Sequence, residues 1–65
     1  MNRYHVQFFL GKKVVAQGYA DGWTRHDAMV KVMETQQYRR AVEMARKKFS
    51  TLMWDATLIK EGLNG

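Results

Sequence analysis

The sequence predicts one small α+β domain: an antiparallel sheet, made of an N-terminal hairpin and a C-terminal strand, packed on a long or broken helix. Apolar residues alternate with a period of two at both ends of the chain, which is typical of strands. A helix-capping pattern lies between these two stretches. Because the chain has 65 residues, all of it is assigned to one domain, 1–65, with the order β-β-α(-α)-β.

Residues 3–20 are expected to form the hairpin. Every second residue from Tyr4 to Leu10 is apolar, as expected for a strand with one buried face. Gly11 and Lys12 then offer a two-residue turn with glycine in the first position, which suits a type II′ turn.

A turn at these two residues sets the register of the hairpin. It pairs Phe8 with Val15 and Tyr4 with Tyr19. Because cross-strand partners lie on the same face of a sheet, Val15 and Tyr19 are expected to face the core.

The helical region is expected to span residues 24–50. Thr24 is a favourable N-cap, and Asp27 three residues later completes a capping box. No glycine or proline interrupts the region, but its apolar residues form two stripes that point to nearly opposite sides of an ideal helix. The first stripe consists of Ala28, Met29, Val32 and Met33, and the second of Tyr38, Ala41, Val42, Ala45 and Phe49.

One small sheet cannot cover both stripes of a straight helix, so two arrangements are open. In the first, the helix breaks around residues 34–37 and both halves fold back on the sheet. In the second, the helix continues and buries its second stripe against another copy of the chain. The second stripe, from Tyr38 to Phe49, is therefore the predicted protein or homodimer interface.

The last predicted element is a strand over residues 52–60. Its residues alternate in two sets, so that one set faces the helical region and the other faces away. The first set is Leu52, Trp54, Ala56 and Leu58, and the second is Met53, Asp55, Thr57 and Ile59. The glycine-containing tail, 62–65, is expected to fray.

The chain is strongly basic, with 11 Lys and Arg against 6 Asp and Glu. A net charge of +5 favours an acidic partner, such as a nucleic acid or an acidic protein surface. No helix-turn-helix, RNP-type or GxxG pattern is present, so base-specific recognition is not predicted. The residues predicted to contact a nucleic acid or an acidic partner are Arg39, Arg40, Arg46, Lys47 and Lys48.

The sequence lacks the residues of a catalytic or metal site. It has no cysteine, its single serine is Ser50, and its two histidines are His5 and His26. No paired carboxylates or metal-type histidine spacing appear, so no nucleophile, acid–base pair or ligand set is predicted. We therefore expect no enzymatic activity, no catalytic residue, no metal and no cofactor.

The chain is expected to act in the cytoplasm and away from membranes. No stretch approaches the roughly 18 apolar residues of a membrane span. The N-terminal residues lack the apolar core of a secretory signal. A chain without cysteine also fits a reducing compartment.

Three stretches carry a resemblance in layout to a known group of proteins. They are YHVQF at 4–8, TRHDA at 24–28 and ATLIK at 56–60. The chain resembles small accessory proteins of phages and prophages, of the host-takeover or anti-defence type. That group includes short inhibitors of host RNA polymerase and of CRISPR effectors, and no functional residue is carried over from it.

These features together predict a non-enzymatic binding protein. The first expectation is a modulator or inhibitor that docks on a larger nucleic-acid-processing machine through methionine and aromatic side chains, with the cations steering association. The alternative is a protein that binds nucleic acid directly and with low specificity, through the basic helical region.

Overall fold

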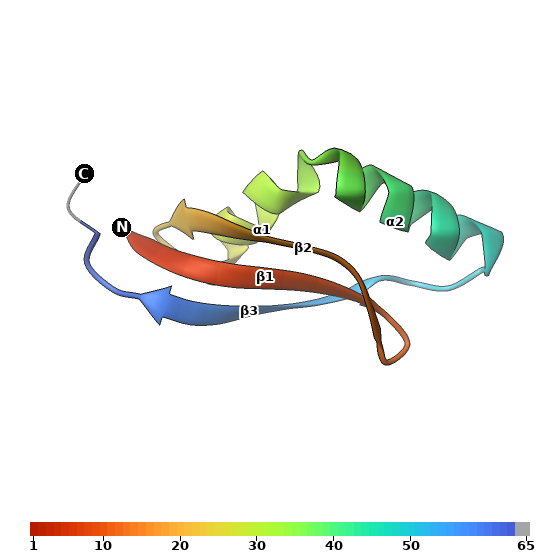
Figure 1. Ribbon diagram of the computed structural model, residues 1–65, viewed down its shortest axis with the longest axis horizontal. Helices are drawn as coiled ribbons and strands as arrows, with labels where there is room; N and C mark the ends of the chain where they lie inside the picture. Colours follow the sequence, from red (N-terminus) through yellow and green to blue (C-terminus); the bar gives the residue numbers. More distant parts are fainter. Residues whose placement is uncertain (64–65) are drawn as a thin grey trace.

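The computed structural model of the protein describes residues 1–63 and confirms the predicted α+β class (Figure 1). Three antiparallel strands form one sheet in the order β2-β1-β3, and both helices lie on the same face of it. Along the chain the elements are β1 (Asn2–Leu10), β2 (Lys13–Gly22), α1 (Arg25–Met33), α2 (Gln36–Lys47) and β3 (Met53–Lys60).

Helix α1 begins at the predicted capping box. The Asp27 backbone N–H donates to Thr24 Oγ1 at 3.1 Å, and the Thr24 backbone N–H donates to Asp27 Oδ2 at 3.3 Å. These two bonds satisfy donors that an uncapped helix start leaves without partners.

The helical region breaks after α1, as in the first of the two arrangements. Thr35 makes the break, because its backbone is extended (φ −84°, ψ 155°). Its hydroxyl donates to the Val32 carbonyl at 2.7 Å and accepts from the Tyr38 backbone N–H at 3.3 Å. One side chain therefore closes the end of α1 and caps the start of α2.

The break turns both apolar stripes toward the sheet. From α1, the side chains of Ala28, Met29 and Val32 are buried, and from α2 those of Ala41 and Ala45. The sheet of the same chain thus covers most of both stripes.

The predicted hairpin turn is present, but the strand beyond it contains a bulge. Leu10 pairs with Lys13 across the two turn residues, and Gly11 has a φ of 64°. Gly11 occupies the first turn position, which needs a positive φ and therefore favours glycine. The register then shifts between Phe8 and Phe9, so that Val15 is an extra residue in β2.

This bulge overturns the predicted register. Phe8 pairs with Ala16 rather than Val15, and Tyr4 pairs with Ala20 rather than Tyr19. Because a slip of one residue moves every side chain to the opposite face, Tyr19 lies on the face away from the helices and is 68% exposed. The small residues of β2 lie under the helices instead, and this lets the two layers approach closely.

The core is built mainly by β1 and the helices. Tyr4, Val6 and Phe8 of β1 are buried, and the rings of Phe8 and Tyr38 pack at a centroid distance of 4.7 Å. The helices pack over β2 and β1, so β3 receives less cover and Ala56 is its buried residue. Strand β3 therefore forms an edge that is exposed on both faces.

The chain returns to its N-terminus after β3. The Gly62 backbone N–H donates to Asn2 Oδ1 at 3.1 Å, and the Leu63 backbone N–H donates to the Met1 carbonyl at 2.6 Å. These bonds hold the first two residues of the predicted frayed tail. The rest of that tail, 64–65, lies outside the described residues.

Candidate functional site

The cations are concentrated in one half of the molecule. The hairpin turn and α2 lie toward the same end, on the right in Figure 1. Together with the residues directly after α2, they contain seven of the eleven Lys and Arg residues but a single acidic residue, Glu43, for a net charge of +6. We call this set the basic end; its cations are Lys12, Lys13, Arg39, Arg40, Arg46, Lys47 and Lys48.

All five cations predicted as contacts belong to the basic end and are exposed. They point outward because Ala41 and Ala45 occupy the side of α2 that faces the sheet. Sequence reasoning missed Lys12 and Lys13, which the hairpin brings into the same half. The two adjacent lysines are visible in the sequence, but nothing local to them shows that the hairpin turn lies in the same half of the molecule as α2.

Acidic neighbours neutralise part of α2 but not its C-terminal end. Glu43 forms an ion pair with Arg46 at 3.7 Å, and Glu43 and Glu34 also line a hollow with Arg39 and Arg40. Lys47 and Lys48, in contrast, have no ion-pair partner among residues 1–63. Cations at this position also complement the negative end of the helix dipole.

The turn after α2 presents an aromatic side chain to solvent. The Phe49 backbone N–H donates to the Arg46 carbonyl at 3.1 Å, and the Ser50 backbone N–H donates to the Ala45 carbonyl at 2.9 Å. This bonding closes the helix with Phe49 in a left-handed conformation, at a φ of 51°. The Phe49 side chain is 99% exposed.

The structure separates the five residues of the predicted interface. Ala41 and Ala45 are buried and Tyr38 and Val42 are half-buried within the chain, whereas Phe49 is fully exposed. Ala41 and Ala45 are therefore covered within a single copy of the chain. Phe49 leaves the stripe because α2 ends at Lys47.

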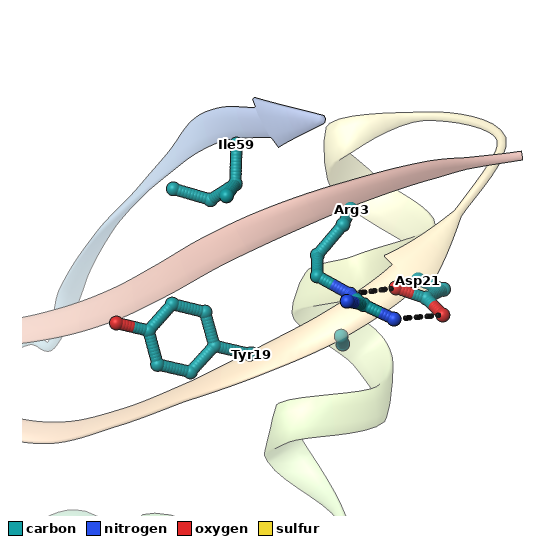
Figure 2. Close-up of a pocket in the computed structure, with 5 residues that line it drawn as sticks. Arg3, Tyr19, Asp21 and Ile59 are labelled. Carbon is teal, nitrogen blue, oxygen red and sulfur yellow. Dashed lines mark hydrogen bonds and ion pairs between the residues drawn. The ribbon is translucent and has the colours of Figure 1, made fainter. Parts of the chain in front are cut away.

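A second surface is the sheet face opposite the helices, which no helix of the described residues covers. Figure 2 shows one end of it, where Tyr19 and Ile59 lie to one side of an ion pair between Arg3 and Asp21. The His5 ring stacks on Tyr19 at a centroid distance of 4.7 Å. The apolar and aromatic residues of this sheet face are Phe9, Val14, Tyr19, Met53 and Ile59.

The ion pair neutralises this end of the sheet face. Arg3 Nε donates to Asp21 Oδ1 at 2.9 Å, and the adjacent Arg3 nitrogen donates to Oδ2 at 3.3 Å. These hydrogen bonds, together with the positive charge of Arg3, hold the pKa of Asp21 below its usual range. The same contacts raise the pKa of Arg3.

Helix side chains close the outer edge of β2. The Gln17 backbone N–H donates to Gln37 Oε1 at 2.8 Å, and Lys31 Nζ donates to the Asp21 carbonyl. Groups that would otherwise be open to another strand are thereby occupied.

The outer edge of β3 is closed at its midpoint by Arg25. Arg25 Nε donates to the Ala56 carbonyl at 3.0 Å, and the guanidinium also donates to Asp55 Oδ1 at 2.6 Å. Asp55 Oδ1 in turn accepts from the Ala56 backbone N–H at 2.9 Å. The guanidinium lies 5.8 Å from the centre of the Trp54 ring.

Replacing Arg25 by alanine is expected to make the protein self-associate. The change frees the Ala56 carbonyl on an edge strand with exposed apolar side chains, which is the situation that promotes strand pairing between molecules. Sedimentation velocity between low and high micromolar concentration measures this as a concentration-dependent rise in mass. Arg39→Ala is the matched control, because it removes the same side chain away from β3. Equal sedimentation of the two variants would contradict the assigned role.

No three His, Cys, Asp or Glu side chains within residues 1–63 lie close enough to hold a metal ion. His5 Nε2 lies 3.0 Å from Gln17 Oε1 on the sheet face, without an acidic partner beside it. No helix in the described part of the chain is both long and apolar enough to cross a membrane.

Comparison of the chain with protein families, with curated proteins and with solved structures gives no match.

Proposed function

We propose that this protein is a non-enzymatic binding protein of the cytoplasm whose basic end contacts the phosphate backbone of a nucleic acid. The observation that carries the proposal is the separation of charge. The basic end has a net charge of +6, while the remaining residues carry four cations and five acidic side chains. A polyanion that approaches this end meets a cationic field which the rest of the molecule does not supply.

The geometry favours contact with the backbone over recognition of base sequence. Lys47 and Lys48 lie at the end of α2 and have no ion-pair partner within residues 1–63. Arg40 lies two turns before Lys47 on the same side of α2. Lysine and arginine bind phosphate oxygens without reading the base. Low sequence specificity and strong salt dependence follow from such contacts.

Neutralising Lys47 and Lys48 together, as Lys47→Gln with Lys48→Gln, is expected to weaken binding to an oligonucleotide and to reduce its salt dependence. Each lost phosphate contact reduces the magnitude of the slope of log K against log salt by about 0.7–0.9, so the double variant is expected to lose about 1.4–1.8. Fluorescence anisotropy titrations at a series of salt concentrations measure both quantities.

A matched control separates the position of the charges from their number. Lys31→Gln with Lys60→Gln removes the same charge outside the basic end, and we expect its salt slope to stay close to that of the unchanged protein. Identical slopes for the two double variants would reject the basic end as the contact surface. An affinity for nucleic acid that does not change with salt would reject phosphate contact altogether.

The uncovered sheet face favours a second candidate function, that of a modulator or inhibitor docking on a larger nucleic-acid-processing machine. Met53 is 63% exposed and Tyr19 is 68% exposed on this face. Aromatic and methionine side chains are typical anchors of protein interfaces. The layout resemblance to accessory proteins of phages and prophages also fits this role.

Affinity purification from a nuclease-treated bacterial lysate distinguishes the two candidates. A docking modulator retains one specific protein after nuclease treatment, keeps it in the Lys47/Lys48 double variant, and loses it when Tyr19 and Met53 are replaced by aspartate. Recovery of the same proteins by the sheet-face variant and the unchanged protein would exclude docking through this face.

A further inference from the structure

Phe49, which directly follows Lys47 and Lys48 in the basic end, does not contribute to the packing of the fold. Its side chain is 99% exposed, so it contributes almost nothing to packing. Its backbone has a φ of 51°, in the left-handed region. Helices that end in this way most often place glycine at this position, because a β-carbon is crowded there.

Both properties make phenylalanine an unfavourable choice for stability. A bulky residue in the left-handed region is uncommon, and such residues concentrate at functional sites. An exposed phenyl ring also adds apolar surface without burying any. The left-handed backbone and the exposed ring both lower stability, so a role in binding, rather than in folding, accounts for phenylalanine at this position.

The neighbours of Phe49 indicate the chemistry of its ligand. Lys47 and Lys48 precede it directly and have no ion-pair partner among the described residues. Interfaces with other proteins are depleted of lysine at their centres. Sites for single-stranded nucleic acid, in contrast, combine phosphate-binding cations with aromatic rings on which bases stack.

From this geometry we infer that Phe49 is a stacking platform for an unpaired base, and that the ligand of the basic end is a single-stranded nucleic acid. The inference rests on the proposed function and specifies its ligand. Lys47 and Lys48 hold phosphates on the strand while the phenyl ring stacks against one base. A base inside a duplex is already stacked on its neighbours and offers no free face to the ring.

The binding experiment compares three probes of equal length: oligo(dT), an abasic strand and a DNA duplex. The unchanged protein is expected to bind oligo(dT) roughly 5- to 150-fold more tightly than the abasic strand, the range that stacking of one base supplies. Phe49→Gly is expected to bind oligo(dT) no more tightly than the abasic strand. Its affinities for the abasic strand and the duplex should stay unchanged, and Phe49→Trp should restore the preference for oligo(dT).

Thermal unfolding of Phe49→Gly distinguishes a ligand contact from a structural role, because replacing a residue that stabilises the fold would lower the Tm. Phe49→Gly relieves the backbone crowding and loses no packing, so its Tm is expected to rise by about 4 °C. A variant that binds oligo(dT) less tightly but melts at a higher temperature has lost a ligand contact rather than its fold.

Each other outcome overturns the inference in a distinguishable way. Equal affinity of Phe49→Gly and the unchanged protein for oligo(dT) excludes stacking. A Phe49→Gly variant that loses affinity and also has a lower Tm excludes it too, because the loss of affinity then follows from a damaged fold. Equal, salt-dependent binding of all three probes by the unchanged protein also excludes stacking but retains the proposed function. Binding of none of the probes rejects both. Unchanged oligonucleotide binding with loss of a captured protein would make Phe49 a protein anchor.

Discussion

Replacing Phe8 by alanine is expected to remove a large part of the protein's free energy of unfolding and to lower its Tm steeply. The Phe8 side chain is 3% exposed and packs on the Tyr38 ring beneath α2. Removing a buried phenyl ring costs about 3–5 kcal/mol. A domain of this length has a total stability of only about 3–10 kcal/mol, so the loss removes a large part of it.

The core has little capacity to fill the resulting cavity. Many of its residues are small, and alanines from both helices and from two strands line the space between the layers: Ala16, Ala28, Ala41 and Ala56. Such side chains have no rotamers with which to move into the gap, so the full cavity cost is expected.

Circular dichroism during heating measures the effect, and Phe9→Ala is the matched control. Phe9 is the next residue of the same strand but lies on the sheet face away from the helices and is only partly buried. Its removal is expected to cost roughly 1–2 kcal/mol, in proportion to the smaller area that it buries. Two variants that melt at similar temperatures would contradict the assignment of Phe8 to the core.

Replacing Gly22 by alanine is expected to destabilise the protein by about 1–3 kcal/mol, the typical cost of inserting a methyl group where there is no room. A β-carbon at Gly22 would lie 2.8 Å from the Asp27 β-carbon, 3.0 Å from the Ala28 backbone nitrogen and 3.2 Å from the Thr24 carbonyl oxygen. Two of these are backbone atoms of the α1 start. The helix itself must therefore shift, and the capping box shifts with it.

Gly18→Ala is the control for this prediction, and urea unfolding measures both variants. Gly18 also lies in β2 under α1, but a β-carbon there would lie 3.4 and 3.6 Å from the Val32 methyl groups, near ordinary contact. Alanine also restricts the unfolded chain more than glycine does, so Gly18→Ala is expected to leave stability unchanged or slightly higher. Equal destabilisation by the two changes would show that the close approach at Gly22 is not what limits packing.

Part of the candidate site was predictable from the sequence. The cations of α2 were assigned correctly to the exposed side of a helix, because the apolar spacing of Ala41 and Ala45 determines which side is buried. Lys12 and Lys13 could not be added, since no local pattern places a hairpin turn in the same half of the molecule as α2. Phe49 was assigned to the apolar stripe by its helical spacing, but α2 ends before it.

The identity and order of the elements were determined by the sequence itself. Period-two alternation, the Thr24 cap and the change of apolar side within the helical region are local properties, and they predicted β-β-α(-α)-β. The structure confirms this order and resolves the helical region into two helices. Thr35 separates the two helices through local hydrogen bonds to Val32 and Tyr38. A threonine at this position is also compatible with a continuous helix, so the sequence alone did not predict the break.

The tertiary structure alone decided which side of β2 is buried. The sequence predicted a regular hairpin, with Val15 and Tyr19 facing the core. Val15 does pack against the core, but it is the extra residue of the bulge, and the bulge moves Tyr19 to the open face. The physical reason is packing between layers. Ala16, Gly18 and Ala20 let α1 and α2 approach β2 closely, whereas the bulky and polar side chains of Gln17 and Tyr19 remain on the open face.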